Sequence, residues 1–101
     1  GYLLVCGGRE SPSYDAMQAL SSTECFRPEL GVWQEGPCLN EARCSSSAAS
    51  LGAWVYICGG SRRQGDQTFV LASVERVDMS GDAQSWERVP SLPYGRCFCA
   101  V

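Results

Sequence analysis

The chain has 101 residues, enough for one modest domain and too few for two domains with separate cores. Its formal net charge is −3 and every basic residue is an arginine, so binding to nucleic acid through a large basic excess is excluded. No uninterrupted apolar run approaches the ~20 residues that a membrane helix needs, and we therefore expect a soluble chain.

The cysteines are better explained as packing groups than as a metal site or a disulfide framework. Cys6 and Cys58 each lie in an apolar run just before a glycine pair, where a small apolar side chain packs well. Seven cysteines is an odd number, Cys97 and Cys99 are the only close pair, and the chain has no histidine. We expect reduced thiols, no metal, no cofactor and a reducing, cytoplasmic location.

Short apolar or alternating runs follow one another along the whole chain, each bounded by Gly, Ser, Asp or Pro. They predict two groups of strands in chain order. The first group comprises 3–8, 23–28 and 32–36, and the second comprises 44–51, 54–60, 73–79 and 84–89. The second group is expected to form one four-stranded antiparallel meander.

The sequence repeats itself with a period near fifty residues. "LLVCGGRE" at 3–10 matches "VYICGGSR" at 55–62, which places Gly7 opposite Gly59 at an offset of 52. A later segment pairs Glu24 with Glu75 and Trp33 with Trp86, and three further positions (Leu39 with Leu92, Arg43 with Arg96, Cys44 with Cys97) match at an offset of 53. One supersecondary unit is therefore used repeatedly.

The repeated motif resembles the Kelch repeat of β-propellers: an Arg, a strand ending in Gly-Gly, the segment Val74–Val77, a Trp, and then Pro-x-Leu-Pro. The resemblance implies an all-β Kelch propeller fragment, with an incomplete repeat at 1–42, a complete blade at 43–95 and the start of another repeat at 96–101. Because both ends fall inside the repeating pattern, we expect an excerpt of a longer protein, or a chain that other chains stabilise.

Two kinds of residue are expected to build the frame of the repeat. A glycine pair at the end of a strand permits a bulge or a close approach of a neighbouring backbone. A large aromatic on the outer strand fills the space between successive blades, and we expect Trp33 and Trp86 to be buried. The structural residues are Gly7, Gly8, Trp33, Gly59, Gly60 and Trp86.

The connections that follow the second and fourth strands of a meander emerge on one face, where most of the arginines gather. Arg offers a planar fork that suits carboxylate or phosphate groups, so an acidic or phosphorylated peptide is the expected ligand. Arg43 and Arg96 fit a structural role and a binding role equally well. The expected partner-binding residues are Arg9, Asn40, Arg43, Ser45, Arg62, Arg63, Tyr94 and Arg96.

The resemblance leaves three functions open. Many Kelch chains of this kind are BTB-Kelch substrate adaptors of cullin-3 ubiquitin ligases, whose BTB region would lie outside these residues. Other Kelch propellers bind actin and the cytoskeleton. A galactose-oxidase-like copper enzyme needs imidazole ligands that the sequence lacks, so we expect no enzyme activity.

Overall fold

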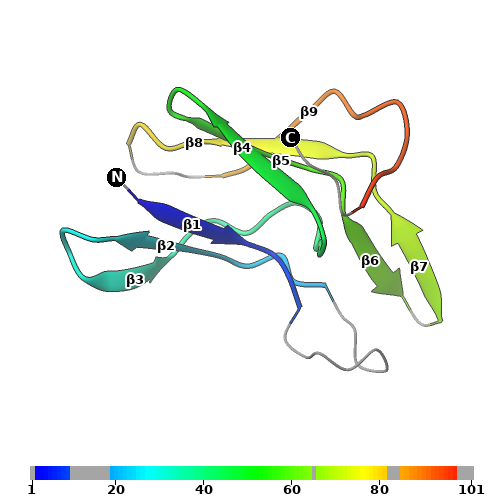
Figure 1. The fold of residues 1–101 in the computed structure, drawn as a ribbon, viewed down its shortest axis with the longest axis horizontal. Coiled ribbons are helices and arrows are strands. Elements are labelled where there is room, and N and C mark those ends of the chain that lie inside the picture. The colour runs from blue at the N-terminus through cyan, green and yellow to red at the C-terminus, as the bar shows by residue number, and fades with distance from the viewer. Residues whose placement is uncertain (1, 10–18, 65, 82–84, 98–101) are drawn as a thin grey trace.

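The computed structural model describes residues 2–9, 19–64, 66–81 and 85–97 (Figure 1). Strands are the only regular elements in these ranges, and no helix there could span a membrane. The strands are β1 (Leu3–Cys6), β2 (Thr23–Arg27), β3 (Val32–Glu35), β4 (Ser47–Leu51), β5 (Trp54–Cys58), β6 (Ser61–Gln64), β7 (Gln67–Val70), β8 (Val74–Asp78) and β9 (Glu87–Val89).

The strands form two antiparallel sheets and one hairpin. The first sheet has the order β1-β2-β3, and the second sheet has the order β4-β5-β8-β9. In Figure 1 the two sheets lie one above the other, and the hairpin β6-β7 extends from one end of the second sheet. This architecture confirms the predicted all-β fold and its four-stranded meander.

All seven predicted strands are present, although each is shorter than its predicted range. The strand predicted from residue 44 begins at Ser47, and the strand predicted to residue 60 ends at Cys58. Residue 84, where the last predicted strand begins, lies outside the described residues. The glycine doublet therefore follows its strand instead of forming part of it.

The hairpin β6-β7 is a correction, because its residues were expected to be a loop. β6 reads Ser-Arg-Arg-Gln, which carries neither the apolar alternation nor the β-branched residues that mark a strand. Its strand conformation comes from pairing with β7, in which Arg62 faces Phe69 and Arg63 faces Thr68. Arg62 and Arg63 thus have fixed positions on a sheet.

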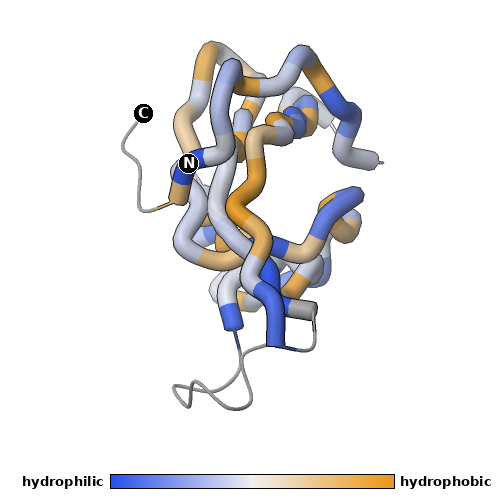
Figure 2. Tube along the Cα trace, turned by 90° about the vertical axis from the view of Figure 1, so that its right-hand side faces the viewer, coloured by the Kyte–Doolittle hydropathy of each residue, from blue (hydrophilic) through white to orange (hydrophobic). Residues whose placement is uncertain are grey.

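The core lies between the two sheets. Val55, Ile57 and Val77 of the second sheet are buried with Leu39 and Trp86, and Leu4 and Cys6 of the first sheet pack against them. Apolar and hydrophilic stretches alternate along the trace in Figure 2, so many short segments contribute to this core. Only every second residue of a strand reaches this core, because successive side chains point to opposite faces of the sheet.

The glycine doublets bring the two repeats into equivalent backbone contacts. The amide of Gly8 donates to the carbonyl oxygen of Arg43 at 2.8 Å, and the amide of Gly60 donates to that of Arg96 at 2.6 Å. Gly60 has φ of +95°, and a Cβ there would lie 2.7 Å from the carbonyl oxygen of Cys44. Both the positive φ and the close backbone approach require glycine, in agreement with the sequence prediction.

Candidate protein-interaction face

The connections that follow β3, β5 and β9 meet at one end of the sheets. Segment 37–46 links the first sheet to the second, and the hairpin leaves β5 beside it: Cys44 and Ser61 form an isolated antiparallel bridge. Segment 90–97 lies against the hairpin, since a Cβ at Gly95 would lie 2.6 Å from the carbonyl oxygen of Val70. We call this end, with residues 40–46, 61–64, 66–70 and 93–96, the loop face.

Arg43 belongs to the loop face by its backbone, but its side chain forms a fully buried ion pair with Glu75 of β8. One Nη atom donates to the carboxylate of Glu75 at 2.7 Å, and both side chains are 0% exposed. Arg43 also donates to the carbonyl oxygens of Gly59 (2.9 Å) and Ser73 (3.0 Å) and to the Ser73 hydroxyl (3.0 Å). A side chain so enclosed cannot reach a partner, so the structural alternative holds for Arg43.

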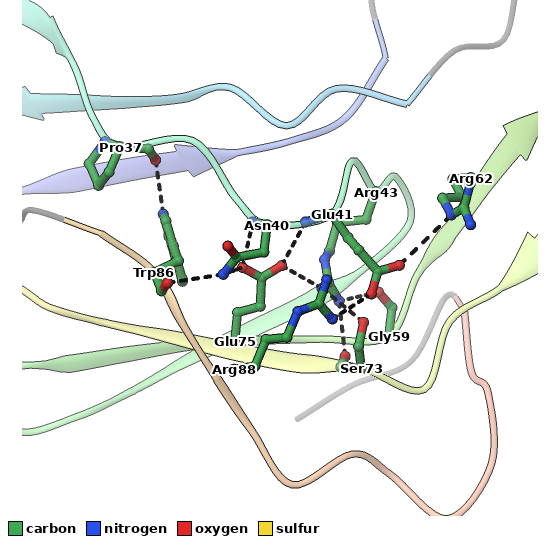
Figure 3. A network of polar contacts seen from close by, with 10 residues as sticks. All are labelled: Pro37, Asn40, Glu41, Arg43, Gly59, Arg62, Ser73, Glu75, Trp86 and Arg88. Carbon is green, nitrogen blue, oxygen red and sulfur yellow. Dashed lines mark hydrogen bonds and ion pairs between the residues drawn. The ribbon is translucent and has the colours of Figure 1, made fainter.

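Asn40 and Glu41 complete the shell around the Glu75 carboxylate (Figure 3). Asn40 donates to one carboxylate oxygen from its backbone amide at 2.7 Å and from Nδ2 at 2.9 Å, while the amide of Glu41 donates to the other at 3.1 Å. Nδ2 of Asn40 also reaches the carbonyl oxygen of Trp86. Asn40 was predicted to contact a partner, but its donors hold segment 37–43 on the second sheet.

Trp86 packs in the core between the two sheets and is 4% exposed, as predicted. Its ring nitrogen donates to the carbonyl oxygen of Pro37 at 3.0 Å. The expected burial of Trp33 is wrong for this structure: Trp33 is 51% exposed and its ring pairs with that of Phe26, centroids 5.1 Å apart. The physical reason is that the described residues place no second sheet over that side of β3.

Three charged side chains at the surface, Glu41, Arg62 and Arg88, connect segment 37–43 with the hairpin and with β9. The Glu41 carboxylate accepts a hydrogen bond from Arg88 at 2.9 Å and lies 3.8 Å from Nε of Arg62. Partial burial raises the pKa of the Glu41 carboxyl, but hydrogen bonds from Ser73 and Arg88, with the Arg88 and Arg43 charges, outweigh it, so the pKa lies below its usual value. Glu41 is therefore an anion that orients two arginines.

Arg62 is also held by an aromatic ring across the hairpin. Its guanidinium carbon lies 5.0 Å from the centroid of Phe69, its direct cross-strand neighbour. Such stacking favours a cation and limits the side chain to few rotamers. The half-exposed Arg62 thus presents its charge at the loop face in a defined orientation.

The other predicted binding residues lie around this group with different exposure. Tyr94 is 72% exposed, and Arg9 and Arg96 are exposed as well. Arg63 is half-buried in β6, and Ser45 has a positive φ of 56°, unusual for a residue other than glycine. The structure therefore brings the exposed members of the set and the hairpin arginines to one end of the molecule.

A hollow of about 280 Å³ lies between the two sheets. Its walls include Leu4, Cys25, Val77 and Trp86, and none of the predicted partner-binding residues lines it. Within the described ranges, no three His, Cys, Asp or Glu side chains gather as metal ligands would, and the six cysteines described are free thiols.

Sequence reasoning missed several contributors to the loop face. Glu75, Arg88 and Phe69 were not assigned to this face. The partners of Glu75 and Arg88 lie far away in the chain, and Phe69 meets Arg62 only through the hairpin, which was not predicted. Arg43 and Glu75, for instance, are separated by 32 positions. The only available signal was the repetition of Glu24 as Glu75 and of Arg43 as Arg96, which marks all four positions as belonging to the frame of the repeat.

The meander, the repeated glycine contacts and the buried Arg–Glu pair define a repeat-built, all-β module. Residues 42–93 match the Kelch motif. Kelch-like protein 33 of Homo sapiens is 35% identical over 78 residues, which cover 77% of this chain and 13% of that protein. The chain belongs to the Kelch-repeat family and is a protein-interaction module.

Proposed function

We propose that the loop face is the substrate-recognition surface of a BTB-Kelch adaptor for a cullin-3 ubiquitin ligase. The support for the ligase is the similarity to a Kelch-like protein, of which this chain spans 13% of the length. The BTB region that binds cullin-3 would lie outside these residues. The six free thiols fit the reducing cytoplasm in which such an adaptor works.

The observation that carries the binding proposal is the orientation of Arg62 on β6, whose neighbour Arg63 points to the opposite face of the hairpin. Arg62 is oriented by Glu41 and by the ring of Phe69, so little side-chain freedom is lost on binding. The exposed Tyr94, in the segment that lies against the hairpin, offers a rigid aromatic contact on the same face. A carboxylate or phosphate on a peptide is the group that this arrangement suits best.

The test compares binding of three labelled peptides to the chain by fluorescence anisotropy: an acidic peptide, its phosphoserine version and a neutral version. The first two should bind more tightly than the third and weaken with added salt. Arg62→Ala with Arg63→Ala should weaken binding about tenfold or more. The control is Arg27→Ala, which removes an arginine at the other end of the sheets.

Equal binding of the neutral peptide, or an unchanged affinity in the double variant, would sink the loop-face site. The adaptor role has its own test, capture of cullin-3 by the full-length protein. Co-sedimentation with actin filaments without cullin-3 capture would favour the cytoskeletal alternative instead.

A further inference from the structure

Glu41 places a negative charge among the arginines of the loop face. One carboxylate oxygen lies 2.9 Å from Nη1 of Arg88 in β9, and the other lies 3.8 Å from Nε of Arg62 in β6 (Figure 3). The Glu41 side chain is 21% exposed, whereas those of Arg62 and Arg88 are 38% and 52% exposed. An anion that approaches these two arginines from solvent therefore also meets the carboxylate of Glu41.

The charge of Glu41 is present at neutral pH and is held in place. Partial burial raises the pKa of its carboxyl, but hydrogen bonds from Ser73 and Arg88, with the charges of Arg88 and Arg43, lower it below its usual value. Its backbone amide donates to the buried carboxylate of Glu75 at 3.1 Å, which ties residue 41 to the second sheet. Glu41 is therefore a fixed internal anion beside Arg62.

The charges on this part of the loop face match a ligand with one negative charge. Arg62 and Arg88 carry two positive charges and Glu41 carries one negative charge, so the group has a net charge of +1. Arg63 lies on the other face of the hairpin, because neighbouring residues of a strand point to opposite sides. The charge of Arg43 is neutralised in its buried ion pair.

A carboxylate and a phosphate respond differently to a site of this charge. Phosphoserine carries about −1.5 to −2 charges at pH 7. The free-energy cost of removing an ion from water grows with the square of its charge, whereas its attraction to fixed charges grows only in proportion to the charge. A site with a small net positive charge therefore offsets the desolvation of a carboxylate more fully than that of a phosphate dianion.

We propose that Glu41 sets the ligand specificity of the loop face, by selecting a carboxylate of the partner over a phosphate. This inference rests on the proposed function and narrows its ligand from acidic or phosphorylated peptides to acidic ones. Glu41 acts through its charge beside Arg62 and Arg88, and the ligand does not need to touch it. A phosphoserine in the partner is thus a poor substitute for an acidic residue at this site.

The test measures the affinity of the full-length protein for three peptides by fluorescence anisotropy, at neutral pH and one ionic strength. The peptides differ at one position, which holds glutamate, phosphoserine or serine, and the wild type should bind the glutamate peptide most tightly. In Glu41→Gln, loss of one charge about 6 Å from the ligand, in water, should tighten binding about threefold for a carboxylate and about tenfold for a dianionic phosphate. The ratio of the two affinities should therefore move about threefold toward the phosphoserine peptide.

Two control variants separate the charge of Glu41 from its shape and from the general charge of the surface. Glu41→Asp keeps the charge and should keep the preference for glutamate. Glu87→Gln removes a charge next to Arg88 in the chain but on the opposite face of β9, where Glu87 pairs with Arg76, and should behave as wild type. Glu41→Gln keeps a side-chain oxygen that accepts hydrogen bonds, so circular dichroism should show a folded protein.

The outcomes distinguish failure of this inference from failure of the proposed function. If the glutamate peptide binds and Arg62→Ala weakens it, the loop-face site stands. The role of Glu41 is then overturned by a wild type that binds the phosphoserine peptide as tightly or more tightly, by an unchanged ratio in Glu41→Gln, or by an equal shift in Glu87→Gln or Glu41→Asp. Equal binding of all three peptides overturns the proposed function, and the role of Glu41 with it.

Discussion

The two sheets show how far one repeat sequence depends on its neighbours. The second sheet buries Glu75 and Trp86 under segment 37–43, whereas the first sheet exposes their counterparts Glu24 and Trp33. The residue types are the same, and the backbone contacts of the glycine doublets are the same. The difference lies in whether another sheet covers the face. Burial in this fold is thus a property of the contact between repeats, in keeping with the nearest-neighbour stability of repeat proteins.

The largest expected difference in unfolding free energy is between the variants Arg43→Ala and Arg96→Ala. Removal of Arg43 leaves the carboxylate of Glu75 buried without its counter-ion, which should cost about 3–5 kcal/mol of unfolding free energy. Arg96 is exposed, so its removal should stay within about 0.5 kcal/mol in a dilute, monomeric sample. Urea unfolding followed by tryptophan fluorescence measures both, and equal losses would contradict the comparison.

The second comparison is Trp86→Ala against Trp33→Ala. Trp86 fills the seam between the sheets, and its truncation should cost about 3–5 kcal/mol. Trp33 contacts the ring of Phe26 at the surface, and its truncation should cost about 0.5–1.5 kcal/mol. Urea unfolding monitored by far-ultraviolet circular dichroism suits both variants. A loss for Trp33 as large as that for Trp86 would show that the exposed face is covered in solution.

The smallest expected effect is on the pKa of Glu41, which accepts a hydrogen bond from Arg88. The first sheet has Glu35 at the position that corresponds to Arg88. A carboxyl whose pKa is lowered by folding stabilises the fold above its ordinary pKa of 4.5, and this contribution is lost as the pH falls through the lowered value. Arg88→Ala should move the pKa of Glu41 upward, as measured by an NMR titration of the carboxyl carbon. Arg76→Ala, which removes the partner of Glu87, is the control and should leave the Glu41 titration unchanged.

The parts of the fold that follow from local chemistry could be predicted from the sequence. Each predicted strand carries its own apolar pattern, and the glycine pair at 59–60 signals a close backbone approach that the structure contains. The hairpin β6-β7 could not be predicted, because Arg62 and Arg63 form a strand only through their pairing with β7. The burial of Arg43 could not be decided either, since it depends on Glu75, 32 positions away.

The contacts that tie one repeat to the next at the glycine doublets run from backbone amide to backbone carbonyl, as between Gly60 and Arg96. Such bonds do not depend on which side chains the neighbouring residues carry. Positions 41, 62, 69 and 94 can therefore change by mutation while the scaffold that displays them stays the same. In evolutionary terms, the backbone of the duplicated unit can be conserved while its surface residues diverge. New binding specificities can then arise on the same fold.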